Sequence, residues 1–195
     1  MTVSADESRA TGLEGRPESQ PQPQPRTVYI DSDMVLLAAH QGRRGIELDI
    51  QADVARGIER LSVFAEQTVI LVYPLHDTSK PMSAAARLKA LHDGLGATLD
   101  GLLVVGCPHD DQACACAKPG SGLIELAMSQ HGLPRYSGWF IGADQEGVVS
   151  ARGAGLNTIR IGPAGIDHLS AVHRPDYEAR HLLDAANHIL VEELS

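Results

Sequence analysis

The sequence predicts an α/β domain in which a parallel sheet is covered by helices on both faces, and three observations lead to this fold class. Short runs of β-branched and aliphatic residues alternate with segments whose apolar residues recur at helical spacing, as in βαβ units. The first apolar run ends on two carboxylates, Asp31 and Asp33, and open parallel sheets bind their ligands at that end of a strand. The 195 residues, 43% of them hydrophobic, are enough to bury one good core.

Charge and composition argue against several function classes. The net charge of -9 disfavours general binding to nucleic acids or to anionic membranes. No apolar run approaches the roughly 20 residues needed to span a bilayer, and the chain does not start with a basic segment followed by an apolar one. Three cysteines, an odd number clustered in one segment, fit a reducing compartment better than a disulfide framework. We therefore expect a cytoplasmic protein.

Residues 1–26 are rich in Glu, Ser, Gln, Gly and Pro and end in alternating glutamine and proline. Such a composition cannot bury enough apolar surface to offset the entropy of ordering. We expect a disordered or extended tail here and a folded domain over residues 27–195. A solvated extension is the simpler interpretation of this tail, and docking to a protein partner through its proline-rich part is the alternative.

The first half of the domain predicts two strands and two helices. Thr27–Ile30 and Thr68–Tyr73 are short apolar runs of the kind found in buried strands. Apolar residues at helical spacing predict a helix over 54–65, with Asp49 as a plausible cap, and another over 84–95.

The second half continues the alternation. Its predicted strands are Gly101–Val105, Trp139–Ile141 and Thr158–Ile161. Between them we expect a helix that begins near Leu123 and is closed by Gly132, and a short helix that ends at Ala154 and Gly155. A final amphipathic helix is expected to start near Asp176.

Residues 107–119 contain every cysteine of the chain, together with a histidine and a lysine. The potential ligands are Cys107, His109, Cys114 and Cys116. Each pair is separated by one residue, and the spacer between the pairs lets the second fold back on the first, so the four can close a tetrahedral zinc site. Four protein ligands leave no open position for water, which predicts a structural zinc rather than a catalytic one. The alternatives are a redox-active thiol pair at Cys114 and Cys116 with the third thiol nearby, and three thiols in a loop with no special role.

This segment, Cys-Pro-His followed by Cys-x-Cys-x-Lys-Pro, resembles the zinc loop of the histidinol-phosphatase and D,D-heptose 1,7-bisphosphate phosphatase branch of the haloacid dehalogenase (HAD) superfamily. The resemblance extends over nearly all of residues 27–193. It implies a three-layer α/β/α, Rossmann-like HAD fold with a parallel sheet, a zinc-stabilised loop and no large cap domain.

The resemblance also implies an activity, which is magnesium-dependent hydrolysis of a small phosphomonoester. The substrate would be a sugar phosphate like D-glycero-D-manno-heptose 1,7-bisphosphate, with histidinol phosphate as the alternative. By the same resemblance Asp31 is the nucleophile that forms a phosphoaspartate and Asp33 is the general acid and base. Both would help to hold magnesium, while Lys118 would screen charge on the phosphoryl group.

The sequence departs from the family pattern at five positions. Met34 stands where the family has a glycine after its Asp-x-Asp motif, and Tyr73 stands near the threonine or serine whose hydroxyl binds phosphate. Ala117 replaces an arginine before the lysine. Strict alignment places Ala143 and Gly147 where the acids that hold and orient magnesium should be.

Two interpretations of these departures remain open. In the first, a one-residue adjustment brings Asp144, or else Glu146, to the cation, while His76, Thr78, Ser79 or Lys80 replaces the missing phosphate-binding hydroxyl. Of these we favour Asp144 for magnesium and His76 and Lys80 for substrate. In the second, the chain is a catalytically impaired pseudophosphatase that acts as a zinc-stabilised binding or scaffold protein.

Overall fold

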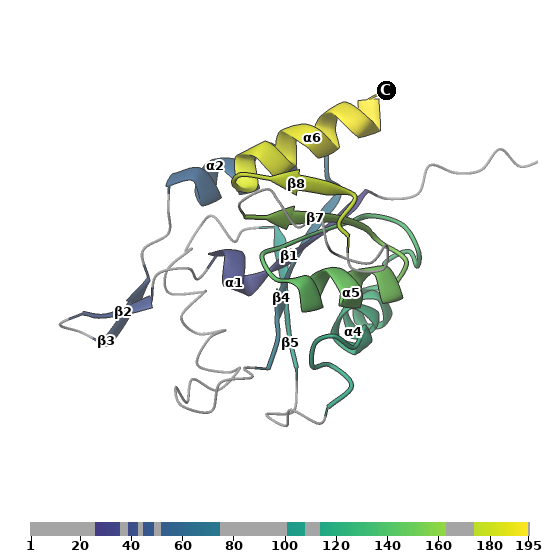
Figure 1. Ribbon diagram of the computed structural model, residues 1–195, viewed down its shortest axis with the longest axis horizontal. Helices are drawn as coiled ribbons and strands as arrows, with labels where there is room; N and C mark the ends of the chain where they lie inside the picture. The colour runs from purple at the N-terminus through teal and green to yellow at the C-terminus, as the bar shows by residue number, and fades with distance from the viewer. Residues whose placement is uncertain are drawn as a thin grey trace, which may run out of the picture.

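A six-stranded parallel sheet forms the centre of the molecule (Figure 1). The computed structural model describes residues 26–35, 39–42, 45–48, 52–74, 101–107, 114–162 and 174–194. The strands are β1 (Thr27–Asp31), β4 (Gln67–Val72), β5 (Leu102–Gly106), β6 (Trp139–Gly142), β7 (Asn157–Ile161) and β8 (Tyr177–Ala179). Their order across the sheet is β5-β4-β1-β6-β7-β8, which places β1 at the centre.

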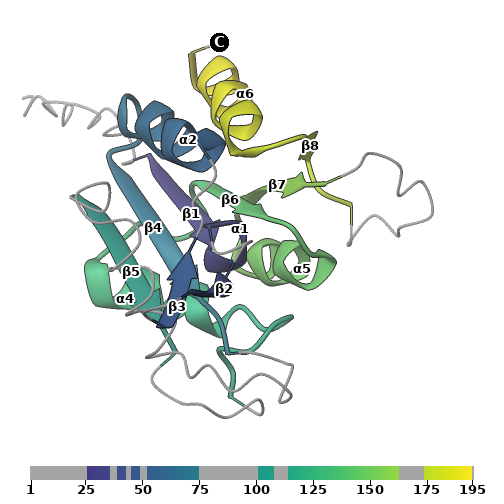
Figure 2. The same ribbon diagram turned by 90° about the vertical axis from the view of Figure 1, so that its left-hand side faces the viewer.

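Helices cover both faces of this sheet (Figures 1 and 2). They are α1 (Ser32–Val35), α2 (Ala52–Ser62), α4 (Gly122–His131), α5 (Gln145–Gly153) and α6 (Leu182–Leu194). Helices α2 and α6 lie together on one face, and α4 and α5 lie on the other. The expected three-layer α/β/α arrangement with a parallel sheet is therefore confirmed.

The pleat of the strands divides the apolar residues between two cores. On β1, Val28 and Ile30 point toward α2 and α6 and join the core on that side. Tyr29, between them, points to the opposite face and packs in the core beneath α4 and α5. β1 is buried along its whole length, which is why its sequence is almost continuously apolar rather than alternating.

Two further strands, β2 (Ala39–Gly42) and β3 (Gly45–Leu48), form an antiparallel hairpin. In both views this hairpin projects on the side toward which the carboxyl end of β1 points (Figures 1 and 2). Neither the hairpin nor the short helix α1 was predicted from the sequence.

The end of the chain corrects one prediction, because the last helix begins at Leu182 and not near Asp176. Asp176 instead anchors strand β8. Its carboxylate accepts hydrogen bonds from the backbone and the hydroxyl of Thr158, both at 2.8 Å, and from Arg152 at 2.7 Å. These contacts place Tyr177–Ala179 alongside β7 as a sixth strand.

The other described elements lie where the sequence predicts them, to within two or three residues at their ends. Helix α4 ends at His131 and is capped by Gly132, whose φ of 63° places it in the left-handed region that favours glycine. The predicted helix over 84–95 and the proposed cap Asp49 lie outside the described residues. Among the residues that the structure describes, no helix is long and apolar enough to cross a bilayer.

The start of α6 gives a test of these local interactions. Asp184 accepts a hydrogen bond from the backbone N–H of Arg180 at 3.0 Å, and its own N–H donates to Nδ1 of His181 at 3.1 Å. The N–H of Asp184 is one that the helix itself leaves unpaired, and the hydrogen bond from Arg180 ties the residues before the helix to its first turn. The backbone hydrogen bond from Arg180 is the main reason that the pKa of Asp184 is lowered.

We predict that Asp184→Ala lowers the free energy of unfolding by about 1 kcal/mol at neutral pH. A lowered carboxyl pKa contributes stability above its unfolded value, near about 4, and this contribution is lost as the pH falls through the folded value. The difference from wild type should therefore shrink in acid, which urea denaturation at several pH values measures. Glu192→Ala, at an exposed position of the same helix, is the control. A deficit that is equally large in acid would contradict the charged cap.

Candidate active site

The carboxyl ends of four neighbouring strands meet at one edge of the sheet. β1 lies between β4 and β6 there, so groups that follow these three strands can lie close together. Asp31 ends β1, Asp33 lies in α1, and Asp144 follows β6. Lys118 reaches the same point from the loop between β5 and α4. The structure thus brings together four of the residues that the sequence singles out.

Lys118 is the centre of this group. Its Nζ donates to Oδ2 of Asp31 and, at 2.5 Å, to Oδ2 of Asp144. Oδ2 of Asp33 is 3.9 Å away. The side chain of Lys118 is only 5% exposed, so the ammonium group has exchanged water for carboxylates. Burial lowers the pKa of Lys118, but the attraction of Asp31 and Asp144 outweighs it, so the pKa is raised and the charge is kept.

Asp31 is fully buried, and both of its carboxylate oxygens are held. Oδ1 accepts the backbone N–H of Asp33 at 3.0 Å, and Oδ2 accepts from Lys118. Burial raises the pKa of Asp31 to about 6, against the opposing effect of Lys118. Asp33 differs, since 44% of its side chain is exposed. A sheltered carboxylate therefore stands beside one that reaches water.

Strict alignment with the family pattern puts Ala143 where an acid should be, but in the structure Asp144 supplies the carboxylate. Ala143 packs against the core beneath α2 and α6, whereas the side chain of Asp144 turns to Lys118. Oδ1 of Asp144 also accepts the backbone N–H of Gly147 at 2.6 Å, so this aspartate is the N-cap of α5. A Cβ atom built on Gly147 would lie 3.1 Å from the ring of Phe140 and 3.2 Å from Oδ1 of Asp144, which leaves little room for an acid at that position.

Asp31, Asp33 and Asp144 each offer a carboxylate oxygen, and these three oxygens lie within 4.8 Å of one another. Hard divalent cations such as Mg²⁺ prefer oxygen ligands of this kind. The donor set therefore fits magnesium, and it contains Asp144 rather than Glu146 among the described residues.

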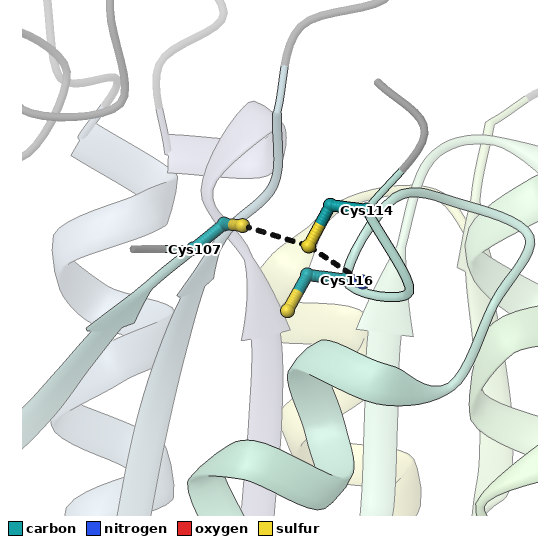
Figure 3. Close-up of side chains that lie close together, drawn as sticks. All are labelled: Cys107, Cys114 and Cys116. Atoms are coloured by element: carbon teal, nitrogen blue, oxygen red, sulfur yellow. Dashed lines mark hydrogen bonds between the residues drawn. The ribbon is translucent and has the colours of Figure 1, made fainter. Parts of the chain in front are cut away.

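A second cluster lies where β5 ends and the loop before α4 begins (Figure 3). The sulfur atoms of Cys107, Cys114 and Cys116 face one another and lie within 4.8 Å of each other. The Sγ atoms of Cys107 and Cys114 are 3.5 Å apart. This distance is too long for a disulfide, and it is close to the roughly 3.8 Å expected between thiolates around a tetrahedral zinc with bonds of about 2.3 Å. The three thiols therefore fit a zinc site.

Burial and the two neighbouring thiols raise the pKa of Cys116 to about 12. A thiol that resists ionisation is a poor redox nucleophile, so Cys116 is poorly suited to start thiol exchange. A bound cation has the opposite effect, because it favours the thiolate that coordinates it.

The loop that carries Cys114, Cys116 and Lys118 is folded back on itself by backbone hydrogen bonds. Gly120 donates to the carbonyl of Ala117 at 2.9 Å, and Gly122 donates to that of Ala115 at 3.2 Å. Cys114, Cys116 and Lys118 thus belong to one compact turn, in which Cys116 and Lys118 are only two residues apart.

Three predicted site residues lie outside the described residues: His109, the fourth zinc ligand, and His76 and Lys80, the substrate contacts. Two buried residues of the site region were not predicted to act in it, namely Tyr73 and Ser150. Tyr73 directly follows β4, at the end of the sheet where ligands bind, and this position could have marked it in the sequence as a candidate site residue. Nothing in the sequence marks Ser150, which is one of several small residues in α5.

Comparison with solved structures identifies the fold. A D,D-heptose 1,7-bisphosphate phosphatase from B. bronchiseptica, complexed with magnesium and phosphate, matches with a TM-score of 0.61 and 18% identity over 86% of this chain and 99% of its own. The D,D-heptose 1,7-bisphosphate phosphatase from Burkholderia thailandensis matches with a TM-score of 0.58 and 12% identity over 85% and 98% of the two chains.

A third match is a Bacillus subtilis protein assigned as a HAD hydrolase and bound to magnesium. Its TM-score is 0.54 at 16% identity over 73% of this chain and 56% of its own. No protein-family model and no curated protein matches the sequence. The chain therefore has the HAD fold that its sequence predicts, at identities that establish the fold alone.

The backbone of the compact turn beside Lys118 packs closely against Gly122, and this contact can be tested. A Cβ atom on Gly122 would lie 2.4 Å from the carbonyl oxygen of Ala115. Gly122→Ala should therefore lower the free energy of unfolding by about 1 to 3 kcal/mol, because the backbone must move to relieve the overlap. Gly153→Ala is the control, since a Cβ there meets nothing closer than 3.6 Å. Chemical denaturation compares the two, and equal stabilities would contradict the close approach.

Proposed function

We propose that this chain is a HAD-type phosphatase that hydrolyses a small phosphomonoester through a phosphoaspartate on Asp31. The observation that carries the proposal is the convergence of Asp31, Asp33, Asp144 and Lys118 at the carboxyl edge of the sheet. A sheltered carboxylate, a solvent-reaching carboxylate and a fixed cation are the groups that transfer of a phosphoryl group to a protein side chain requires.

In the first step, a carboxylate oxygen of Asp31 forms a bond to phosphorus as the ester P–O bond breaks. The leaving oxygen takes the electron pair of that bond and a proton from Asp33. In the second step Asp33 removes a proton from water, whose oxygen attacks phosphorus and releases Asp31 and inorganic phosphate. The exposed position of Asp33 suits an acid and base that must meet both alcohol and water.

Lys118 compensates the negative charge that gathers between the phosphoryl group and Asp31. Asp31, Asp33 and Asp144 would hold Mg²⁺, which when bound would neutralise charge on the phosphoryl oxygens. The buried ammonium is already fixed before substrate arrives, so little reorganisation is needed during the reaction.

For the substrate we propose a sugar phosphate similar to D-glycero-D-manno-heptose 1,7-bisphosphate, with histidinol phosphate as the alternative. The support is the resemblance of the 107–119 segment and the fold shared with two heptose bisphosphate phosphatases. The three thiols support a structural zinc in this segment, where the turn would help to shape the substrate entrance.

A second candidate function is a binding or scaffold protein that has lost turnover. Its support is the close packing around Gly147, where strict alignment expects a further acid, and the position of Tyr73 directly after β4, where the family that the sequence resembles carries a phosphate-binding hydroxyl. The following experiment separates the two functions.

We predict magnesium-dependent release of phosphate from a panel of sugar phosphates and histidinol phosphate. Asp31→Asn should reduce kcat by roughly a thousandfold or more, since the amide cannot act as the nucleophile. Asp144→Asn should raise the magnesium concentration for half-maximal rate by about tenfold, because a ligand charge is lost while asparagine still caps α5. Glu146→Gln is the matched control and should behave as wild type. A folded wild type as inert as Asp31→Asn would favour the binding function.

A separate prediction concerns zinc. Cys114→Ser should remove most of the zinc and lower the melting temperature by about 5 °C or more, because the free energy of binding metal is also folding free energy. Elemental analysis of protein purified under reducing conditions, with calorimetry, measures both. A variant that loses zinc yet melts at the wild-type temperature would refute the structural role. Wild-type protein without metal and with readily oxidised thiols would favour a redox sensor.

A further inference from the structure

The aromatic ring of Tyr73 lies against the ammonium group of Lys118. Nζ is 4.7 Å from the ring centroid, within the range in which the negative face of an aromatic ring attracts a cation. The side chain of Tyr73 is buried, so the contact is shielded from water and is stronger than it would be at the surface. Lys118 is thus held by carboxylates and also by a ring.

The hydroxyl group of the same tyrosine is anchored to helix α5. It lies 3.4 Å from Oγ of Ser150, which in turn donates to the carbonyl oxygen of Gly120 at 2.7 Å. A serine hydroxyl has one proton, and a carbonyl can only accept, so the proton of Ser150 is used on Gly120. The Tyr73 hydroxyl is therefore the donor in its contact with Ser150.

These contacts link both ends of Lys118 to the same two residues. The ammonium group contacts the ring of Tyr73, and the hydroxyl of Tyr73 contacts Ser150. Ser150 in turn holds Gly120, which lies two residues after the lysine in the same loop. Helix α5 carries Ser150 and is capped at its start by Asp144. Helix α5 therefore positions both Asp144, which accepts a hydrogen bond from the ammonium group, and Ser150, which holds the loop of Lys118.

We propose that Tyr73 and Ser150 are positioning residues that hold Lys118 in its catalytic place between Asp31 and Asp144. The inference rests on the proposed phosphatase function. Tyr73 acts through the lysine and does not bind phosphate itself. A lysine side chain is long and flexible, and its charge assists phosphoryl transfer only when it is fixed where charge develops. The ring restricts the far end of the side chain, and the Ser150–Gly120 hydrogen bond restricts its backbone.

The first test reads the position of Lys118 without any need for catalysis. The sequence contains three lysines, Lys80, Lys89 and Lys118. Protein labelled with ¹³C at the lysine ε-carbons should therefore give a simple spectrum, assigned with Lys118→Arg. Protons near an aromatic face resonate upfield, so we expect one such shifted signal in wild type and in Tyr73→Phe, and its loss in Tyr73→Leu.

The second test measures kcat and KM separately for the substrate with the highest turnover. Tyr73→Leu should lower kcat about tenfold, in proportion to a shielded cation–π contact. Tyr73→Phe removes only the link between Tyr73 and Ser150 and should lower kcat by about two- to threefold. Ser150→Ala also removes the hydrogen bond to Gly120 and should lower kcat further, and the double variant should lose no more than Ser150→Ala alone. KM should change less than kcat in every variant.

Tyr29 provides matched controls for a merely structural effect. It lies in the same core as Tyr73, and its hydroxyl has no hydrogen-bond partner among the described residues. Tyr29→Phe and Tyr29→Leu should alter the melting temperature but leave kcat of the folded enzyme and the lysine spectrum unchanged.

The two readouts separate this inference from the proposed function. If wild type releases no phosphate, the phosphatase proposal fails while the lysine spectrum still decides whether the ring of Tyr73 contacts Lys118. If Tyr73→Leu keeps the wild-type lysine signal, or keeps kcat in an enzyme that turns over, the positioning role is overturned. Loss of both in Tyr73→Leu but not in Tyr29→Leu would support it.

Discussion

The ammonium group of Lys118, buried between Asp31 and Asp144, is the interaction on which the arrangement of this edge of the sheet depends. A buried charge is costly unless it is paired, and removal of one partner leaves the other uncompensated. The ion pairs join the ends of β1 and β6 to the loop after β5. Three segments that are distant in the sequence are thereby held in one geometry, and the same contacts that make their burial tolerable align the groups suited to phosphoryl transfer.

The thiol cluster and the lysine are linked, because two of the three thiols, Cys114 and Cys116, share one turn with Lys118. Cys116 is separated from Lys118 by a single residue, and hydrogen bonds from Gly120 and Gly122 close the turn on the other side. Any ion held by the thiols would restrict this turn at its start, and Ser150 restricts it at its end. A metal assigned to structure would therefore also influence how accurately the charge of Lys118 is placed.

The sequence predicts the layers of the fold well, because burial on both faces imposes long apolar runs such as Thr27–Ile30. It does not reveal β8, since Tyr177–Ala179 is short and is held by side-chain contacts of Asp176 that no local pattern encodes. The place of Asp31 and Asp33 follows from their position at the end of a strand, whereas that of Lys118, in the loop before α4, was implied only by the resemblance of its segment to a known family. The strand pattern does not tell whether position 143 or 144 faces Lys118. That is decided by the packing of Ala143 against the core and by the capping of α5 by Asp144.

Asp144 has two contacts, and this affects how the residue would change during evolution. One oxygen caps α5 and the other faces Lys118, so replacement of this residue would weaken the helix as well as the proposed chemistry. In a lineage that abandoned turnover, selection for a stable helix alone would keep an aspartate or asparagine here. Asp33 is half exposed and lies outside the two cores, so it would drift sooner. Among related genes, a retained Asp144 would therefore say little about catalytic activity. Retention or loss of Asp33 would be the better indicator of activity.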